Sequence, residues 1–392
     1  MRVTPFVPHA PAVLAGVLRS GGWDEWKADA AAQGTEVAAL RITGLDADAI
    51  EHLVRHAGRK LGLEVQTGDG WAVVLGSRAR LQALARPWVG PPELAELAHQ
   101  IGLALPVELP VMWPTARGTV SLEQPVLVGI LNLTPDSFSD GGALLTVAAA
   151  IAHAERLLED GATLLDVGGE STRPGRPGPV SAADELARVV PVVAALVRRW
   201  PALLVSVDTV KAGVARAAID AGAAIVNDVS AFRLDPKMGE VAAASGAGVV
   251  LMHARGGVTD MATYDHADYG GDVVGVVLEE LRASVDAATA CGVLPDRVVI
   301  DPGFGFSKTV EQNILLADQL AALRALGRPV LVGPSRKRFL GAITARELPD
   351  RDRATAALCA LAYERGARLF RVHDPAATKD ALRIAHALGG PQ

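Results

Sequence analysis

The sequence predicts an α/β protein in which a (β/α)8 TIM barrel over residues 115–392 follows a small α+β domain over residues 1–114. From about residue 125, eight short β-branched runs alternate with Ala- and Leu-rich segments of helical period. The runs are apolar throughout, which is typical of parallel strands covered on both faces. Eight such units over about 270 residues fit a closed barrel in number and length. The alternative, a doubly wound open sheet, would be expected to carry a dinucleotide-binding glycine fingerprint, and none is present.

Composition limits the possible functions. The 392 residues exceed the usual size of one hydrophobic core, so two domains are expected. With 38 basic and 44 acidic residues the net charge is −6, which argues against a nucleic-acid-binding surface. No apolar run reaches the roughly 18 residues that span a bilayer, and prolines at positions 5, 8 and 11 interrupt the N-terminal apolar stretch. We therefore expect a cytoplasmic protein that binds neither nucleic acid nor membrane.

The N-terminal domain is expected to contain a mixed sheet. Its predicted elements are, in order, a strand at 37–45, a helix at 46–62 capped by Asp46, a hairpin at 63–77 and a helix after Pro92. Five of the six tryptophans lie in this region, which suggests a packing or oligomerisation unit. A second enzyme or a regulatory module is the alternative, but no catalytic cluster supports it, and no family is assigned to the domain. Residues 113–124 are predicted to be a joint or a hairpin that closes the barrel floor.

The eight predicted barrel strands are VLVGIL (126–131), TLLDVG (163–168), LLVSVD (203–208), AAIVND (223–228), GVVLMH (248–253), RVVIDP (297–302), PVLVGP (329–334) and RLFRVH (368–373). Each ends near polar groups: Asn132, Asp166, Asp208, Asn227, Asp228, His253, Asp301, Ser335, Lys337, Arg371 and His373. Polar groups are costly to bury, and the strand bodies contain almost none. Their concentration at one end of every unit indicates an active site at the carboxyl ends of the strands.

Acid and amide groups come first among these residues. The carboxylates of Asp208 and Asp301 match paired N–H donors, such as those on a 2-amino-pyrimidinone ring edge, and the Asn227 amide can both donate and accept. One such Asp could equally cap the next helix. Several of them on separate strands, all at the same end, favour a common ligand.

Basic groups form a second set, composed of Arg173, Lys337, Arg371 and His373. Arg, Lys and His suit phosphate binding and the stabilisation of an anion. Arg371 ends an apolar strand, so its charge should need an anionic partner. Arg173 could alternatively be a solvated loop charge.

Metal and nucleophile motifs are sparse. No zinc-spaced cluster, P-loop, GxSxG motif or Ser–His–Asp arrangement occurs, and His253 alone is weak evidence for a metal. Asn132, with phosphate oxygens completing the coordination, fits Mg²⁺.

Phe306 offers an apolar wall for a flat ring, although core packing is the alternative. Cys291 and Cys359 lack a CxxC spacing and are expected to be buried, reduced thiols, with one disulfide as the alternative.

Eight motifs in this order resemble those of the dihydropteroate synthases of folate biosynthesis: GILNLTPDSFSDGG, DVGGESTRPG, SVDT, IVND, LMH, DPGFGF, VGPSRK and RVHD. The resemblance extends from about residue 115 to the C-terminus. It implies a transferase that condenses 6-hydroxymethyl-7,8-dihydropterin diphosphate with p-aminobenzoate. The products are 7,8-dihydropteroate and pyrophosphate, formed by dissociative substitution at the pterin methylene. It also implies a Mg²⁺ cofactor, a homodimer and competition by sulfonamides.

The same resemblance implies a role for each matching residue. The catalytic residues that contact the pterin would be Asp208, Asn227, Asp301 and Lys337. The catalytic residues that hold the diphosphate would be Arg371 and His373, joined by Arg173, with Asn132 as the magnesium ligand. The p-aminobenzoate site would consist of Thr172, Arg173, Phe306, Ser335 and Lys337, closed by a loop that contains Asp140.

Two positions depart from the family pattern: Ala254 stands where Met is frequent, and Pro334 where a small or flexible residue is common. Both are expected to alter the shape of a subsite without removing a contact. Two alternative functions stay open. One is a corrinoid-dependent pterin methyltransferase domain, which would not need the SRK and RVHD groups. The other is a non-catalytic pterin-binding or scaffolding homologue.

Overall fold

The computed structural model describes residues 1–6, 37–86, 92–105, 107–134, 146–170, 179–348 and 350–388. The chain divides into two compact units. The first contains residues 1–108 together with 272–278 and 318–327, and the second contains 109–271, 279–317 and 328–392. The division at residue 114 stays a prediction.

Within the described part of the second unit, eight parallel strands close into a barrel, which confirms the predicted fold class. Each strand follows one of the apolar runs of the sequence. In chain order they are β7 (Val126–Asn132), β8 (Leu164–Gly168), β9 (Leu204–Asp208), β10 (Ile225–Asp228), β11 (Gly248–Met252), β12 (Val298–Asp301), β13 (Val330–Val332) and β14 (Ala367–Val372). Neighbours in sequence are neighbours in the barrel, and β14 pairs with β7 to close it.

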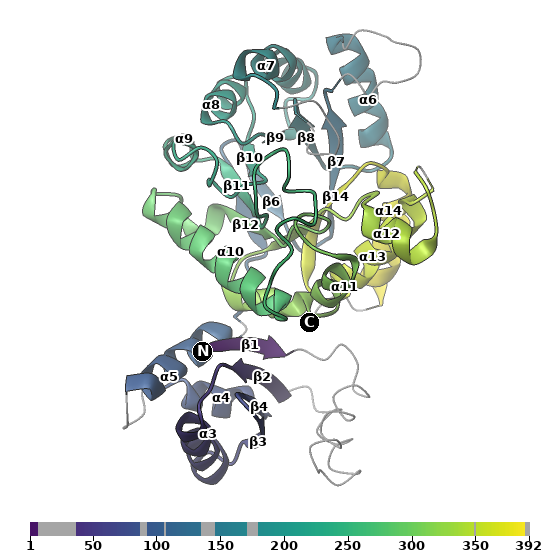
Figure 1. Ribbon diagram of the computed structural model, residues 1–392. Helices are drawn as coiled ribbons and strands as arrows, with labels where there is room; N and C mark the ends of the chain where they lie inside the picture. The colour runs from purple at the N-terminus through teal and green to yellow at the C-terminus, as the bar shows by residue number, and fades with distance from the viewer. Residues whose placement is uncertain are drawn as a thin grey trace. The chain divides into compact units, whose positions relative to one another are not determined.

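Helices surround the strands as a ring (Figure 1). They are α6 (Val147–Glu159), α7 (Ala182–Arg199), α8 (Ala212–Asp220), α9 (Met238–Ser245), α10 (Val273–Ala290), α11 (Val310–Asp318), α12 (Arg338–Thr344), α13 (Asp352–Glu364) and α14 (Pro375–Ala387), with the 3₁₀ turn η3 (Pro295–Arg297). A second 3₁₀ turn, η4 (Leu320–Leu326), belongs to the first unit. Side-chain caps fix several of their starts. Thr146 accepts from Ala149 N at 3.1 Å, and Asp374 accepts from Ala377 N at 3.0 Å. The Asp374 cap sets the turn directly after His373.

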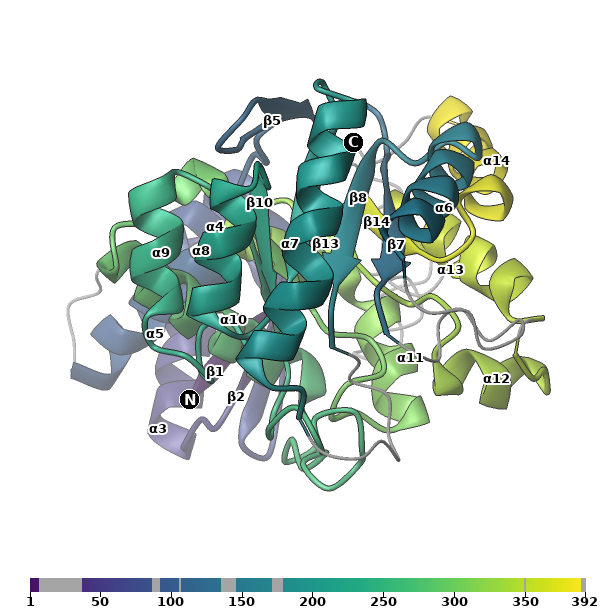
Figure 2. The same cartoon turned by 90° about the horizontal axis from the view of Figure 1, so that it is seen from above.

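The strand register determines which side chains meet inside the barrel. Asn132 pairs with Gly168, Gly168 with Asp208, and Asp208 with Asn227, so these four residues form one row across β7 to β10. Side chains two residues apart on a strand share a face, which places Asp166 directly below this row. The carboxyl ends of β7 and β8 point the same way (Figure 2).

An apolar plug fills the opposite end of the barrel. It includes Trp113 and Val120 from a short hairpin formed by β5 (Met112–Pro114) and β6 (Thr119–Ser121). Trp113 is fully buried, and its indole N–H donates to Arg297 O at 2.8 Å. The predicted hairpin at the barrel floor is therefore present. Because the plug is apolar, the polar groups of the barrel interior gather at the carboxyl ends of the strands.

The first unit contains a four-stranded sheet in the order β1-β2-β4-β3. Its elements are β1 (Arg2–Phe6), β2 (Val37–Thr43), α3 (Ala47–Leu53), the π-helical η1 (Val54–Lys60), β3 (Glu64–Gly68), β4 (Trp71–Ser77), α4 (Arg78–Leu84) and α5 (Pro92–Ala104). The predicted α+β class is confirmed, but the expected mixed sheet is wrong, because all three strand pairs are antiparallel. Alternation of Ala72 and Val74 with less buried residues gives the sheet one face for a separate core.

No helix in the described ranges is both long enough and apolar enough to cross a bilayer. Both cysteines are free thiols. Cys359 is buried in α13, as expected, but the expectation for Cys291 is wrong. It lies just after the end of α10 and is exposed.

Candidate active site

A cavity of about 320 Å³, here called the site cavity, opens at the carboxyl ends of the barrel strands. Six of the predicted site residues line it: Asn132, Asp208, Ser335, Lys337, Arg371 and His373. Other lining residues include Glu170, Arg336, Arg338 and Arg351. Asn227, Asp301 and Phe306 are joined to this set by the contacts described below. The predicted residues Asp140, Thr172 and Arg173 lie outside the described ranges.

Arg371 is the centre of an ionic network. Its Nε donates to Asp166 Oδ2 and its Nη2 donates to Asp208 Oδ2, each at 2.6 Å. Burial alone would lower the pKa of Arg371, but the carboxylates of Asp166 and Asp208 raise it above its usual range. The guanidinium therefore stays charged, and the predicted anionic partner of Arg371 is present as two carboxylates of the protein.

Asp166 also orients Asn227. The Asn227 amide donates from Nδ2 to Asp166 Oδ2 at 2.9 Å, so one oxygen atom serves both Arg371 and Asn227. Asp166 is only 1% exposed. Its second oxygen, Oδ1, has no hydrogen-bond partner within the described part of the chain. Asp166 appeared among the strand ends of the sequence without a site role. Its inward position follows from its spacing of two residues from Gly168.

Burial raises the pKa of Asp208 well above its usual range, and the Asp166 carboxylate adds to this change. The neighbouring Arg371 guanidinium opposes it. The negative charge of Asp208 is therefore destabilised by burial but stabilised by its ion pair with Arg371. Carboxylates with such shifted pKa values at the wall of a cavity are typical of ligand-binding sites.

Asp301 begins a tight loop, residues 301–306, here called the DPGFGF loop. Its Oδ1 accepts from Gly303 N at 2.7 Å. Gly303 has φ +69°, and a Cβ there would lie 2.0 Å from His253 O, so only glycine fits. Burial raises the pKa of Asp301 to about 6, opposed by the Gly303 hydrogen bond and by the charges of Lys337, Lys308 and Arg371.

The other Asp301 oxygen, Oδ2, lies near Gly333, which lines the cavity. A Cβ on Gly333 would lie 3.8 Å from both Asp301 Oδ2 and Arg371 Cβ. The absence of a side chain at Gly333 therefore keeps a small space open between the Asp301 carboxylate and the aliphatic part of Arg371.

Phe306 ends the DPGFGF loop and lies below Lys337. The Lys337 Nζ is 3.7 Å from the centroid of the Phe306 ring. Phe306 packs in an apolar cluster with Met252, Ala254 and Met261. The ring is therefore a core residue, as one of the two interpretations of the sequence has it, and it contacts Lys337, which lines the cavity. A role as a wall for a bound ring stays a prediction. Ala254, a departure from the family pattern, lies in this same cluster.

Ser335 and His373 are hydrogen bonded. Ser335 Oγ lies 2.9 Å from His373 Nδ1 and accepts from His373 N at 3.1 Å. The next residue, Arg336, adopts φ +59° and forms a two-point ion pair with Asp352, at 2.8 Å for each contact. Arg336 N also donates to Thr355 Oγ1 at 3.2 Å. These contacts hold the SRK segment against α13 and so fix Ser335 at the cavity.

The residues present fit a magnesium ion held by few protein ligands. No group of three His, Cys, Asp or Glu side chains in the described chain could hold a metal. Two oxygens border the space beside Gly168, here called the oxygen-lined space. An added Cβ there would lie 3.5 Å from Asn132 Oδ1 and from Asp208 Cβ, and 3.6 Å from Asp208 Oδ2, which also accepts from Arg371. Mg²⁺ prefers oxygen donors and completes its shell with water and phosphate.

Sequence reasoning missed Glu170, which lines the cavity. Glu170 Oε2 accepts from Lys211 Nζ at 2.6 Å, and its Oε1 accepts from Val180 N at 2.6 Å. Lys211 also pairs with Glu185 at 2.5 Å. A carboxylate at the end of the DVGGE motif was the available signal, but its partners come from the residues just before α7 and α8.

Comparison with known proteins identifies the barrel. Residues 128–373 match the family described as pterin binding enzyme. The chain is 45% identical to the dihydropteroate synthase of Synechocystis sp. over 263 residues, which are 67% of this chain and 89% of that protein.

Solved structures agree. The dihydropteroate synthase of Xanthomonas albilineans with 4-aminobenzoic acid is 48% identical, with a TM-score of 0.64 over 69% of this chain and 95% of that one. The same enzyme in complex with 7,8-dihydropteroate gives 46% identity and a TM-score of 0.62, over 69% and 95%. The Yersinia pestis enzyme in a sulfonamide drug complex gives 39% identity and a TM-score of 0.65, over 71% and 98%.

Proposed function

The chain belongs to the dihydropteroate synthase family of pterin-binding enzymes, and from this premise we propose how its site cavity carries out the family's reaction. The enzyme is a transferase of folate biosynthesis. It condenses 6-hydroxymethyl-7,8-dihydropterin diphosphate with p-aminobenzoate and releases pyrophosphate. The observation that carries the residue assignment is the convergence of Asp208, Asn227 and Arg371, through Asp166, beside one cavity at the strand ends.

The pterin ring is assigned to the acid and amide groups. Asp208 and Asp301 each have one oxygen engaged by a protein donor, Asp208 by Arg371 and Asp301 by Gly303. The second oxygen of each can accept from the 2-amino group and ring N–H of the pterin. The Asn227 amide, oriented by Asp166, would complete the ring edge, and Lys337 would approach from the other side. This assignment is supported by the shared row of β9 and β10.

The diphosphate is assigned to the basic side of the cavity. Arg371 and His373 both line it and lie two residues apart at the end of β14. Asn132 is proposed as a protein ligand of Mg²⁺, with the diphosphate and water as its other ligands. When bound, the ion would neutralise charge that develops on the departing pyrophosphate. Arg173 is proposed to join this group from the STRPG loop.

The chemistry needs little from a general base. The C–O bond at the pterin methylene breaks, and its electron pair leaves with the pyrophosphate. Positive charge then spreads into the electron-rich ring, where the carboxylates of Asp208 and Asp301 stabilise it. The nitrogen of p-aminobenzoate is already neutral at pH 7, attacks the methylene and loses its proton to solvent. The protein therefore orients the reactants and stabilises charge.

The p-aminobenzoate subsite is assigned to Phe306, Ser335 and Lys337. The Phe306 ring can pack on the arylamine, while the Ser335 hydroxyl and Lys337 can meet its carboxylate. Thr172 and Arg173, with a loop containing Asp140, are proposed to close this subsite. Sulfonamides, which mimic p-aminobenzoate, are expected to compete there.

A pyrophosphate-release assay tests the activity. The purified chain should release pyrophosphate only when both substrates and Mg²⁺ are present, with an equal amount of dihydropteroate detected by mass spectrometry. Asp208→Asn should remove release while leaving the fold intact, whereas Asp220→Asn, an exposed acid at the end of α8, should not. A corrinoid-dependent methyltransferase would release no pyrophosphate. A non-catalytic homologue would bind the pterin diphosphate without turnover.

A homodimer is proposed through α13 and α14, the last two helices of the chain. Leu361 on α13 is 48% exposed, Ile384 on α14 is 63% exposed, and Leu388 just after α14 is 79% exposed. Exposed apolar side chains on these two packed helices favour an interface. Light scattering should give twice the chain mass, and Leu361→Lys with Ile384→Lys should reduce it to one chain. A cytoplasmic location is also proposed, supported by the two free thiols.

A further inference from the structure

Lys308 is a lysine buried in the barrel unit, with 1% of its surface exposed. Its Nζ lies 3.0 Å from His253 Nδ1, 3.1 Å from Gly303 O and 3.0 Å from Phe306 O. A fourth atom, His253 O, lies at 3.5 Å. An ammonium group has three N–H donors, and the three closer acceptors match them in number. A neutral amine would leave one acceptor without a donor.

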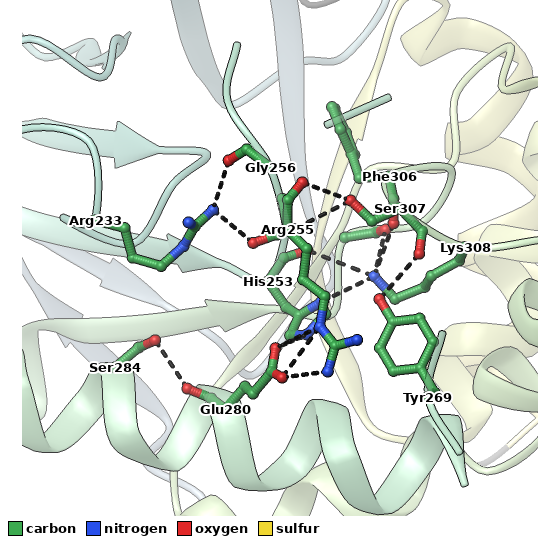
Figure 3. Close-up of polar contacts among 12 residues, drawn as sticks. Arg233, His253, Arg255, Gly256, Tyr269, Glu280, Ser284, Phe306, Ser307 and Lys308 are labelled. Atoms are coloured by element: carbon green, nitrogen blue, oxygen red, sulfur yellow. Dashed lines mark hydrogen bonds and ion pairs between the residues drawn. The ribbon is translucent and has the colours of Figure 1, made fainter. Parts of the chain in front are cut away.

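The contacts of His253 determine its tautomer. Since Nδ1 accepts from Lys308, the ring proton is on Nε2, which donates to Glu280 Oε2 at 2.8 Å. His253 is therefore neutral. In agreement, burial and the nearby Lys308 charge together lower its pKa to about 4. Figure 3 shows the imidazole between Glu280, which rises from α10, and Lys308. We call Lys308, His253 and Glu280 the Lys308 relay.

The relay ends on the DPGFGF loop. Lys308 bonds to the carbonyls of Gly303 and Phe306, and the N–H of Gly303 in turn fixes the Asp301 carboxylate. Ser307, with φ +49°, is held separately, because its Oγ accepts from Arg255 N at 3.0 Å and its carbonyl accepts from Tyr269 OH at 3.0 Å. The loop is thus anchored to α10 and to the segment that follows β11.

The relay also acts electrostatically. Burial lowers the pKa of Lys308 to about 7, while the charges of Asp301 and Glu280 favour its protonated form. In the reverse direction, the positive charge of Lys308 favours the ionised form of Asp301. Glu280, held by His253 and by Arg255, has its pKa depressed to about 2 despite partial burial, so it supplies a stable negative charge.

We propose that Lys308 is a positioning residue for the reaction, acting through the Lys308 relay to orient Asp301 and Phe306 and to keep Asp301 ionised. Lys308 contacts no substrate in this assignment. The proposal rests on the proposed function, because it takes Asp301 to bind the pterin as a carboxylate. A purely structural lysine would hold the loop but would not influence the ionisation of Asp301.

The experiment measures kcat/KM for the pterin diphosphate between pH 5 and 8 in the wild type and in Lys308→Met. On the acid side, the wild type should lose kcat/KM as two carboxylates take up protons: Asp301, whose pKa is about 6, and Asp208, whose pKa is also raised. In Lys308→Met we expect kcat/KM to fall by at least about tenfold at pH 7 and the acid limb to move upward by about one pH unit.

The charged or titratable groups that face Asp301 and Lys308 are His253, Arg255, Tyr269, Glu280, Lys337 and Arg371.

Tyr269→Phe is the matched control, because it removes the hydrogen bond to Ser307 O, next to the loop, without removing a charge. It should leave the acid limb in place. Lys237→Met, at an exposed position before α9, should change neither quantity. If Lys308→Met does not fold, Glu280→Gln replaces it as the test. Glu280 is partly exposed, and its loss should lower the pKa of Lys308 and move the acid limb upward by a smaller amount.

The outcomes separate the two proposals. A folded Lys308→Met or Glu280→Gln enzyme with the wild-type acid limb would overturn the role of the relay. A wild-type protein that releases no pyrophosphate would contradict the proposed function instead.

Discussion

Arg371 and Asp208 form an ion pair, with 2.6 Å between Nη2 and Oδ2, at the carboxyl ends of the barrel strands. They are 163 residues apart in the chain. Because the same guanidinium also binds Asp166, one side chain from β14 ties β8 and β9 together. Asp166 is almost fully buried, so its ion pair with Arg371 stabilises the fold, while Arg371 also lines the cavity. Removing Arg371 should therefore affect both stability and activity.

Arg371→Ala should abolish activity and also lower stability. The stability loss follows because the variant leaves the Asp166 carboxylate buried without a cation. We expect a loss of about 3 kcal/mol in the free energy of unfolding, measured in urea. Lys337→Ala should lose activity with a change below about 1 kcal/mol, since Lys337 is only partly buried. Equal stability losses in the two variants would contradict this distinction.

Asp301→Asn should inactivate the enzyme but stabilise it at alkaline pH. The usual Asp pKa of 3.8 is raised to about 6 here, so the folded state binds this proton more tightly than the unfolded state. Folded-state stability is therefore lost as pH rises from about 4 to beyond 6. An Asn side chain is neutral, so the variant does not lose stability in this pH range, and its Oδ1 can still accept from Gly303 N. We expect the variant to be more stable than the wild type by up to about 3 kcal/mol at pH 8, fading below pH 4. Urea unfolding at both pH values would measure this, and a variant less stable at pH 8 would oppose it.

The sequence predicted the barrel and the gathering of polar residues at the ends of its strands, for a physical reason. Apolar runs mark parallel strands, and a polar residue at the end of such a run has few places to go except the carboxyl rim. Asn132, Asp208 and Asn227 fall in one row because neighbouring parallel strands pair in a regular register. None of these steps needs knowledge of distant contacts.

The pairings within the site could not be predicted in this way. That Asp166 serves both Arg371 and Asn227 depends on the barrel's closure and strand tilt, which a local pattern does not contain. The partners of Lys308 come from β11, the DPGFGF loop and, through His253, α10, so its spacing in the sequence gave no signal. The error on the N-terminal sheet has a related cause, since strand direction depends on how the chain returns between strands.

Asn132→Ala should raise the Mg²⁺ concentration needed for half-maximal activity by at least about tenfold. The reason is that Asn132 Oδ1 is the proposed protein ligand at the oxygen-lined space beside Gly168. Activity without added metal, after dialysis against EDTA, should vanish in both the variant and the wild type and return with Mg²⁺. The thermal midpoint should change little, because the Asn132 side chain is only partly buried. An unchanged Mg²⁺ requirement would remove Asn132 from the metal site.

Gly168→Ala tests the same space without removing any polar group. The added methyl would lie 3.5 Å from Asn132 Oδ1 and 3.6 Å from Asp208 Oδ2, which are ordinary contact distances. Gly168 does not occupy the left-handed region of φ, so the fold should accept the change. The methyl would, however, fill the space between the two oxygens and displace any ligand atom or metal ion bound there. We expect kcat/KM for the pterin diphosphate to fall by about tenfold or more, with pyrophosphate binding weakened in parallel.

Gly213→Ala on α8 is the control for Gly168→Ala, because nothing lies within 4 Å of the added Cβ. It should raise the free energy of unfolding by about 0.5–1 kcal/mol and leave kcat/KM unchanged. If Gly168→Ala keeps full activity while folded, ligand does not occupy the space between Asn132 and Asp208. The Mg²⁺ and diphosphate assignments would then have to move toward His373 and the SRK segment, which also line the cavity.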